Sequence, residues 1–523
     1  MTEDAQPARP PVIVRFAPSP TGYLHLGSAR TGLYNYIFAR RHGGTFILRI
    51  EDTDLSRSTD EAISQILSSM REMGLDWDEG PEVPGPHGPY RQTERQSIYR
   101  EYIDRLLASG HIYPCFCTPE ELEEERQAAQ EEKRAWVYGG KCRSLAPEEV
   151  ARRKAEGERY TLRMHVPPGK TVFHDMLRDP VEFDNETIGD FIVVRSDGSI
   201  TYNLAVVVDD MTMEITHVIR GDDHISNTPK QIQIYEALGA RVPHFLHMPL
   251  LFGTDKKKLS KRHGATKLEQ LTAMGYQVEV VRNYLAFLST EFDESMIDWT
   301  LDDLVWRLDV EKLGTSASIF DPEKLKWMNG RFMRRMDPEE FTKRMIAYLT
   351  RAGFYGNPLC VADLAAAGPQ VLAEAVSGVE ESGRVSPEPP DEAQERLTRL
   401  VAPLVQEKIE VLADFVPLAG WFFWPLALNG EARELLAATA GAATTLLAAA
   451  ADLRALPDWD LAAIETVVRE LPAKLAAKPK AVFAALRLGM SGQSVTPGLF
   501  ESLHALGREE AIVRLELAAA LVN

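Results

Sequence analysis

The pattern of apolar and polar residues near the N-terminus alternates between strand-like and helix-like periods. Runs rich in β-branched apolar residues predict buried strands, and apolar residues at helical spacing predict the helices between them. Strands are expected at 12–17, 45–50 and 214–220, helices at 28–41 and 58–74, and a further apolar run lies at 204–210. Such alternation predicts a parallel sheet with crossover helices.

The middle and the C-terminal half follow other patterns. Residues 93–200 are charged and mixed, with a hairpin signal at 196–199, and are interpreted as an insertion that splits the parallel-sheet fold. After Lys267 the periodicity becomes helical almost throughout. An alanine-rich helix is expected over 435–451, and the Pro/Gly/Glu-rich stretch 382–390 is interpreted as a linker or loop.

Composition narrows the class of protein. A chain of 523 residues is too long for one core, so two to four domains are expected. The acidic N-terminal residues 1–11 do not resemble a signal peptide, and four cysteines do not suggest a disulfide framework. We therefore expect a cytoplasmic protein with no membrane partner. The net charge of −19 still permits nucleic-acid binding through local basic tracts at 256–262 and 331–335.

A turn rich in proline and glycine joins the first strand to the first helix. It runs from Pro18 to Ser28 and reads Pro-Ser-Pro-Thr-Gly-Tyr-Leu-His-Leu-Gly-Ser. A strand, a tight turn and a helix N-terminus favour phosphate, because free backbone N–H groups and the helix dipole attract anions. Gly27 would allow close approach of a nucleotide, and His25 would donate to phosphate oxygens. Taken alone, a His-x-Gly sequence is most often an ordinary turn with a surface histidine.

A dense basic run lies much later in the chain, at 256–263, and contains Lys-Leu-Ser-Lys-Arg. Taken alone it is as often a solvated face or a nucleic-acid patch. Gly253 before it and Gly264 after it indicate a mobile loop. Several cations on such a loop suit a reaction at a phosphoryl centre, where negative charge develops.

Together, in this order, the two motifs resemble the ATP-handling signatures of the class I aminoacyl-tRNA synthetases. Residues around them resemble the bacterial glutamyl-tRNA synthetases, most densely at 15–57, 80–95, 201–228, 249–265 and 320–330. Glutaminyl-tRNA synthetases share the catalytic half but usually end in β-barrels, and the relative that glutamylates queuosine in tRNA is much shorter. The long helical C-terminus here fits the glutamyl type.

The resemblance implies an α/β fold, in which a Rossmann-type parallel-sheet catalytic domain carries an α+β insertion and precedes an all-α anticodon-binding region. The expected segments are two catalytic halves at 10–92 and 201–255 and an acceptor-stem-binding insertion at 93–200. A stem-contact domain carrying the Lys-Leu-Ser-Lys-Arg loop is expected at 256–336. The helical anticodon-binding region at 337–523 is expected to form two subdomains.

The resemblance also assigns site residues. Catalysis is assigned to His25, Lys258 and Lys261. ATP binding is assigned to Pro18, Ser19, His25, Gly27, Ser28, Asp223, Lys258, Leu259, Ser260, Lys261 and Arg262. Glutamate binding is assigned to Arg15, Ala17, Ser19, Glu51, Tyr202 and Arg220. Arginine suits a carboxylate because its fork donates two parallel hydrogen bonds, and Glu51 supplies a negative partner for the ammonium group. Glu51, Asp52 and Asp54 are alternatively a magnesium cluster.

Three cysteines in the insertion form a candidate zinc site. Cys115 and Cys117 are followed by Cys142, and zinc prefers four thiolate or imidazole ligands. Some members of the family use a Cys-x-Cys and Cys-x-His pattern, but Ser144 stands where that histidine would be. Tyr138, four residues before Cys142, is one candidate for the fourth ligand.

The reaction implied is the activation of L-glutamate by ATP, with Mg²⁺, and transfer of the glutamyl group to tRNA(Glu), by a monomer whose first step requires tRNA. Whether tRNA(Gln) is also charged depends on a C-terminal position matched best by Lys408, where strict enzymes carry arginine. Trp421, Phe422, Phe423 and Trp424 are nearby candidates for anticodon stacking, or core. The alternatives are a relaxed enzyme or a synthetase-like tRNA-binding protein without catalysis.

Overall fold

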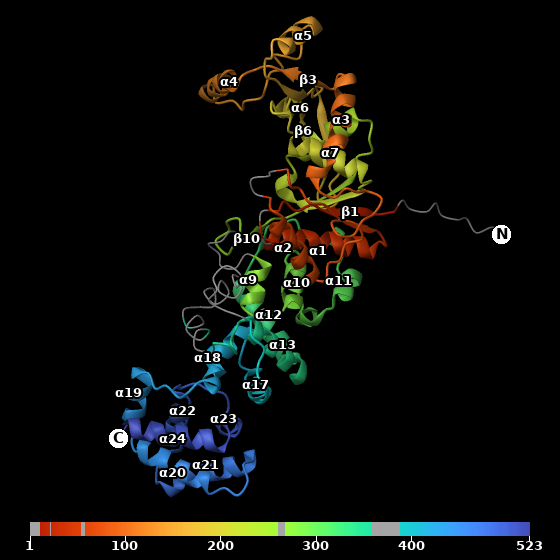
Figure 1. Cartoon of the computed structure of the whole chain (residues 1–523). Helices are drawn as coiled ribbons and strands as arrows, with labels where there is room; N and C mark the ends of the chain where they lie inside the picture. The colour runs from red at the N-terminus through yellow and green to blue at the C-terminus, as the bar shows by residue number, and fades with distance from the viewer. Residues whose placement is uncertain are drawn as a thin grey trace, which may run out of the picture. The chain divides into compact units, whose positions relative to one another are not determined.

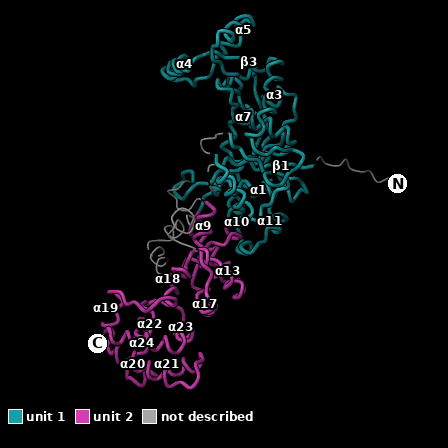
Figure 2. Tube along the Cα trace, viewed as in Figure 1, with its two compact units in different colours: residues 1–260, 282–320 teal, residues 261–281, 321–523 magenta. Residues whose placement is uncertain are grey.

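The computed structural model describes residues 11–20, 22, 24–53, 58–259, 267–357, 361, 366 and 387–522. The chain forms two compact units (Figures 1 and 2). Unit 1 comprises residues 1–260 and 282–320, and unit 2 comprises residues 261–281 and 321–523.

Unit 1 is built on a four-stranded parallel sheet with the strand order β2-β1-β8-β9. The strands are β1 (Ile13–Phe16), β2 (Thr45–Leu48), β8 (His217–Gly221) and β9 (His244–Met248). The crossover helices are α1 (Leu26–Arg41), α2 (Asp60–Glu72), α7 (Tyr202–Thr212) and α8 (Thr228–Ala237). The expected parallel α/β fold is confirmed. The apolar run 204–210 belongs to α7, and all seven of its residues are buried.

The insertion forms its own small sheets above this fold. The elements are η1 (Gln92–Arg95), α3 (Gln96–Ala108), β3 (Ile112–Cys115), α4 (Pro119–Glu131), α5 (Pro147–Ala155), β4 (Thr161–Met164), β5 (Lys170–Phe173), β6 (Val181–Asp184), α6 (Asn185–Ile188) and β7 (Ile192–Val194). Strands β3, β4 and β7 form one antiparallel sheet, and β5 pairs with β6 in an antiparallel hairpin. The residues 196–199 that carry the hairpin signal form the turn after β7, and Val194 and Ile200 on either side of this turn pair in an antiparallel bridge.

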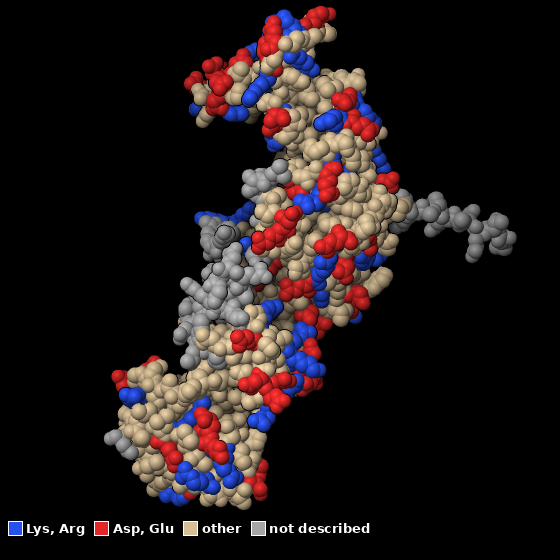
Figure 3. Space-filling view, in the orientation of Figure 1, with Lys and Arg blue, Asp and Glu red and all other residues tan. Residues whose placement is uncertain are grey.

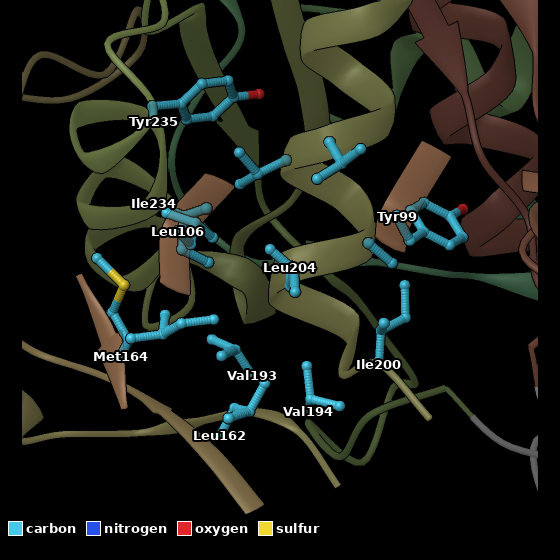
Figure 4. Close-up of a cluster of buried hydrophobic side chains, with 14 of the residues drawn as sticks. Tyr99, Leu106, Leu162, Met164, Val193, Val194, Ile200, Leu204, Ile234 and Tyr235 are labelled. Carbon is cyan, nitrogen blue, oxygen red and sulfur yellow. The ribbon is translucent and has the colours of Figure 1, made fainter. Parts of the chain in front are cut away.

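A buried cluster joins the insertion to the catalytic fold (Figure 4). It includes Tyr99 and Leu106 from α3, Leu162 from β4, Val193 from β7 and Leu204 from α7. A second cluster packs Phe173 of β5 onto strands of the parallel sheet. The insertion therefore shares one hydrophobic core with α7 and α8 and another with the parallel sheet.

The remaining elements of unit 1 follow β8 in the chain. They are η2 (Asp222–His224), β10 (Leu251–Phe252), η4 (Glu294–Asp298), α11 (Leu301–Arg307), η5 (Val310–Lys312) and β11 (Ser318–Ile319). Strand β10 pairs in parallel with β11. Helix α10 (Val278–Phe287) contributes residues to both units.

Unit 2 is helical in its described residues. Its elements are α9 (Leu268–Ala273), α12 (Pro322–Arg335), α13 (Pro338–Arg351), α17 (Glu392–Val405), η6 (Leu412–Asp414), α18 (Phe415–Ala419), η7 (Gly420–Phe423), α19 (Gly430–Ala438), α20 (Ala442–Arg454), α21 (Leu461–Lys474), α22 (Pro479–Ser491), α23 (Leu499–Leu506) and α24 (Arg508–Val522). The start of α13 shows why such segments become helices: the Asp337 carboxylate accepts hydrogen bonds from the backbone N–H groups of Glu339 and Glu340, and Pro338 fills the first turn.

One expected helix of unit 2 is wrong in its continuity. Residues 435–451 are divided between α19 and α20, because Gly441 adopts a left-handed conformation with φ +71° at the break. Of the expected linker at 382–390, residues 382–386 lie outside the described residues and 387–390 form no element. Trp421 is buried and stacks on Phe422 with ring centroids 3.8 Å apart, so these two rings belong to the core.

No single described helix is long and apolar enough to cross a membrane; α19 and α20 pass that test only as a pair, bent by 91° at their break. On the face seen in Figure 3, acidic side chains gather over α4, which carries Glu120, Glu121, Glu123, Glu124, Glu125 and Glu131.

Candidate active site

A cavity of about 440 Å³ opens at the carboxyl ends of β1 and β8, beside the N-terminus of α1. This is the edge at which open α/β sheets bind ligands. Every described residue that the sequence assigned to glutamate or ATP lines it: Arg15, Ala17, Pro18, Ser19, His25, Gly27, Ser28, Glu51, Tyr202, Arg220, Asp223, Lys258 and Leu259. Ser260, Lys261 and Arg262 lie outside the described residues. Asp54, part of the alternative magnesium cluster, also lies outside them.

The N-terminus of α1 forms one wall of the cavity. His25 is the N-cap residue, and its Nδ1 accepts a hydrogen bond of 3.2 Å from the Gly27 N–H. In the neutral ring the proton then sits on Nε2, which is the donor that a phosphate oxygen would need. The first turn of α1 contains no acidic residue, so the positive end of the helix dipole keeps its attraction for an anion.

The geometry at Gly27 explains why the smallest residue stands there. A Cβ atom at this position would meet, among the described residues, only His25 Nδ1 at 3.5 Å, which is ordinary van der Waals contact. The backbone is in the right-handed helical region and needs no glycine for its conformation. The residue's lack of a side chain therefore leaves open the cavity wall, where a ligand would approach the backbone.

Arg15 lies at the floor of the cavity and is held by a buried carboxylate. Its Nε donates to Asp210 Oδ1 at 3.1 Å, and Arg49 Nη1 donates to the same oxygen at 2.6 Å. Burial alone would raise the pKa of Asp210, but the charges of Arg15 and Arg49 outweigh it and keep the pKa below its usual range. Asp210 therefore stays ionised and fixes both guanidinium groups.

Glu51 is the carboxylate that connects this buried network of arginines and Asp210 to the cavity. Arg49 Nη2 donates to Glu51 Oε1 at 3.3 Å. Burial raises the pKa of Glu51 above its usual value even though Arg49 and Arg15 act in the opposite sense. An ammonium group bound beside this carboxylate would favour its ionised form. Asp52 is occupied differently, because its oxygens accept from Arg91 Nε at 3.0 Å and from the Thr93 N–H at 2.9 Å.

Arg220 lies at the end of β8 with two of its three guanidinium nitrogens already bonded. Nε donates to His247 Nε2 at 3.2 Å, and Nη2 donates to Thr228 Oγ1 at 2.8 Å. Nη1 is buried and has no hydrogen-bond partner among the described residues. Burial lowers the pKa of Arg220, and the nearby charge of Arg15 adds to this. A carboxylate ligand would supply both the missing acceptor and the missing negative charge.

Tyr202 forms another wall of the cavity, and its hydroxyl shares a 3.0 Å hydrogen bond with His224 Nδ1. Burial and the nearby carboxylate of Glu51 raise the pKa of Tyr202 to about 12, so the hydroxyl remains protonated. Burial and the charge of Arg220 lower the pKa of His224 to about 4, so this imidazole is neutral at pH 7. The wall thus offers polar contacts without a net charge.

Lys258 and Asp223 both line the cavity and form an ion pair with each other. Lys258 Nζ lies 3.2 Å from Asp223 Oδ2, and the Lys258 side chain is largely exposed. The backbone of the lysine is fixed by a bridge to Phe252 of β10, and Leu259 N–H donates to Leu251 O at 3.0 Å. The first lysine of the Lys-Leu-Ser-Lys-Arg sequence is therefore placed at the cavity by main-chain pairing.

The structure brings together the three predicted cysteines and Tyr138. The sulfur atoms of Cys115, Cys117 and Cys142 lie within 4.8 Å of one another. The Tyr138 hydroxyl lies 3.3 Å from Cys115 Sγ and 3.5 Å from Cys117 Sγ. The Arg163 guanidinium stacks on the tyrosine ring at 3.8 Å and would favour negative charge on this group of ligands. Three neighbouring thiols fit three of the four ligands that a structural zinc ion requires, and the Tyr138 hydroxyl is the polar group closest at hand for the fourth position.

Sequence reasoning missed the residues that hold the arginines in place. The only sequence signal for Asp209 and Asp210 is that these two acids stand at the end of the apolar run 204–210. Asp209 accepts from Arg95 Nε at 2.6 Å and from Gln92 Nε2 at 2.8 Å, in the same buried network. Asp175 and His247, which support Arg220, carry no local motif.

Comparison with known proteins decides the family. Residues 11–327 match the family described as tRNA synthetases class I (E and Q), catalytic domain, and residues 365–519 match an anticodon binding domain. The chain is 43% identical to glutamate–tRNA ligase 2 of Rubrobacter xylanophilus over 507 residues, which covers 96% of each chain. The protein belongs to the glutamate–tRNA ligase family of class I synthetases.

Further relatives extend this result. The synthetase shares 40% identity over 517 residues with the glutamate–tRNA ligase of Moorella thermoacetica, covering 98% of this chain and 99% of the relative. A crystal structure of a glutamate tRNA ligase from Elizabethkingia meningosepticum, in complex with its amino acid, matches the synthetase with a TM-score of 0.80 at 28% identity. The match covers 98% of this chain and 100% of that one.

Proposed function

We propose that this synthetase joins L-glutamate to tRNA(Glu) in two steps within the described cavity. The observation that carries the proposal is Arg220, which lines the same cavity as Arg15 and Glu51 and whose buried Nη1 has no hydrogen-bond partner among the described residues. Glutamate carries two carboxylates and one ammonium group, so its site needs two cationic partners and one anionic partner. The three residues provide them. The adjacent N-terminus of α1 and Lys258 provide for phosphate.

The residues then take the following roles. Arg220 binds the side-chain carboxylate, Arg15 is a further carboxylate partner, and Glu51 binds the ammonium group. Tyr202, Ala17 and Ser19 line the amino-acid pocket. Lone-pair attack by the α-carboxylate of glutamate on the α-phosphate of ATP forms glutamyl-adenylate and releases pyrophosphate. The 3′-terminal adenosine of tRNA then takes the glutamyl group and AMP leaves.

The ATP side is assigned to the remaining cavity residues and to the basic loop. His25, Gly27 and Ser28 contact the phosphates at the helix N-terminus, and Asp223 binds the ribose hydroxyls. The remaining contacts come from Pro18, Ser19, Lys258, Leu259, Ser260, Lys261 and Arg262. Lys258 and Lys261 stabilise the charge that develops on the leaving pyrophosphate, so catalysis rests on positioning and electrostatics. Mg²⁺ bound to ATP would neutralise phosphate charge.

The other segments supply the tRNA contacts. Residues 93–200 bind the acceptor stem, 256–336 contact the stem and 337–523 bind the anticodon, while 10–92 and 201–255 form the catalytic fold. We place the enzyme in the cytoplasm as a monomer. Zinc is held by Cys115, Cys117, Tyr138 and Cys142, where it would tie the segment after β3 to the segment before α5.

A charging assay with labelled glutamate and purified tRNA(Glu) tests the proposal. Charging with glutamate supports it, whereas tRNA binding without charging would favour a non-catalytic tRNA-binding protein. Glutamate-dependent ATP–pyrophosphate exchange, measured with and without tRNA, tests whether the first step requires tRNA. Full exchange without tRNA would contradict that requirement.

A second question is whether the enzyme also charges tRNA(Gln), which depends on the position matched best by Lys408. Its Nζ donates to Thr496 O at 3.2 Å, so the lysine is partly engaged within unit 2. We favour strict specificity for tRNA(Glu). Charging of purified tRNA(Gln) at a comparable rate would identify the relaxed enzyme instead.

A further inference from the structure

The side chain of Arg220 is held from behind by a histidine that has no place in the motifs. His247 lies on β9, is fully buried, and its Nε2 is 3.2 Å from Arg220 Nε and 3.1 Å from Thr228 Oγ1. The Thr228 hydroxyl accepts from Arg220 Nη2 and donates to His224 O at 3.2 Å. Two guanidinium nitrogens are thus fixed, and only Nη1 lacks a partner among the described residues.

This contact defines the protonation state of the imidazole. A guanidinium group only donates hydrogen bonds, so His247 Nε2 must carry a lone pair and the ring proton must be on Nδ1. His247 Nδ1 lies 2.6 Å from Asp175 Oδ2, which accepts that proton's hydrogen bond. Burial, reinforced by the charge of Arg220, lowers the pKa of His247 to about 4 despite the hydrogen bond to Asp175. The ring is therefore neutral at pH 7.

Asp175 is itself firmly held. Its Oδ1 accepts from the Leu177 N–H and its Oδ2 from the His247 N–H, each at 3.0 Å. Burial would raise the pKa of Asp175, but the hydrogen bonds from His247 and Leu177 outweigh it and keep the pKa below its usual range. The carboxylate is thus an ionised acceptor with a fixed orientation, and it selects the Nδ1–H tautomer of His247.

Aromatic packing prevents the imidazole from turning. The rings of Phe173 and Phe245 lie 6.0 and 5.9 Å from that of His247, and the Arg220 guanidinium lies 5.5 Å from the Phe245 ring. Asp175 and Phe173 belong to the insertion, whereas His247 and Phe245 belong to β9. The support for Arg220 therefore starts in the insertion and crosses two strands of the parallel sheet.

We propose that His247 is a positioning residue for amino-acid specificity, which holds Arg220 Nη1 toward the side-chain carboxylate of the substrate, and that Asp175 fixes the tautomer required for this. The inference rests on the proposed function, because it assumes that Arg220 binds that carboxylate. Without His247 the guanidinium gains rotational freedom and its Nε loses its acceptor. Glutamate binding then weakens, while the ATP contacts on the other side of the cavity are unchanged.

The test compares His247→Leu, His247→Gln and Asp175→Asn in steady-state charging assays. His247→Leu removes the acceptor, and we expect the KM for glutamate to rise about 10- to 100-fold, the loss typical of one charge-assisted hydrogen bond. The KM for ATP should stay within about twofold. His247→Gln offers an amide oxygen to Arg220 and should recover most of the loss. Asp175→Asn replaces one of the two acceptor oxygens by an amide group that cannot accept and removes the negative charge, so it weakens the hold on the Nδ1–H tautomer and should also raise the KM for glutamate.

His217→Leu is the matched control, because His217 begins β8, stacks on His244 and lies at the other end of the same strand pair from Arg220. The inference is overturned if His247→Leu raises the KM for glutamate no more than His217→Leu does, or raises both KM values equally. If His247→Leu does not fold, an unchanged glutamate KM in folded Asp175→Asn overturns it. A wild-type protein that charges no glutamate would instead defeat the proposed function.

Discussion

Replacement of Asp210 by asparagine tests whether the buried charge network sets both the stability of unit 1 and the shape of the cavity in which we propose that glutamate binds. Asp210 is 2% exposed and accepts from Arg15 and Arg49, so the variant leaves two buried guanidinium groups without their shared anion. Removing one partner of a buried ion pair costs about 3–5 kcal/mol. Because asparagine keeps one acceptor oxygen, we expect the lower end, about 3 kcal/mol.

Differential scanning calorimetry is the suitable assay because it resolves separate unfolding transitions, and a chain with two units need not unfold in a single one. For a unit of this size, about 3 kcal/mol corresponds to a decrease of about 6 °C in the Tm of the transition that ligands of the cavity stabilise. Glu182→Gln is the control, because its pair with Lys170 is exposed and contributes at most about 1 kcal/mol. The KM for glutamate should rise with Asp210→Asn and stay constant with Glu182→Gln.

The same variant has a defined pH dependence. The pKa of Asp210 is depressed in the folded state, so the carboxylate contributes stability above its unfolded pKa of about 3.9 and loses it as the pH falls through the folded value. The Tm difference between wild type and variant should therefore be constant from about pH 5 to pH 8 and shrink below about pH 4. A Tm difference at pH 7 no larger than that of Glu182→Gln would refute the reasoning.

Three further predictions concern the ATP site and the cysteine cluster. Gly27→Ala should fold as well as wild type, because its Cβ meets only ordinary contact, but should raise the KM for ATP at least tenfold; an unchanged KM would mean that ATP does not approach this backbone. Lys261→Ala should lower the rate of glutamate activation by orders of magnitude and weaken ATP binding less. The control Lys257→Ala, in the same basic run, should leave both the rate and the ATP affinity unchanged. Equal losses of rate and of ATP affinity in Lys261→Ala would mean that the lysine only binds ATP. Tyr138→Phe should reduce zinc bound per chain, measured by atomic emission after dialysis, and full zinc retention would remove the phenol from the ligand set.

The sequence predicted the residues that line the cavity better than those that support them. Arg15 and Arg220 could be placed in one cleft because each ends a strand of a parallel sheet, and the carboxyl ends of such strands share an edge. Their supports cannot be found in this way. Asp210 joins Arg15 of β1 to Arg49, which directly follows β2, and Asp175 lies 72 residues before His247, so both contacts depend on the tertiary fold.

The helical C-terminus shows a different limit. Alanine and leucine at helical spacing predicted one helix over 435–451, and the local propensity is indeed helical on both sides of the break. The left-handed Gly441 and the change of direction after Thr439 are set by packing, since α20 packs extensively against α24 and α19 also contacts α24. Propensity therefore identified the type of structure and not its continuity.

The way in which the insertion is anchored has a consequence for engineering the enzyme. Its outer helices, α4 and α5, expose most of their surface, but Phe173 packs on the parallel sheet and the cluster around Leu162 and Val193 is shared with α7 and α8. Excising residues 93–200, or grafting them onto another synthetase, would open two hydrophobic cores and remove the carboxylate of Asp175. We therefore expect α4 and α5 to be the part of the insertion that tolerates exchange best, whereas the β5–β6 hairpin must stay with the parallel-sheet fold.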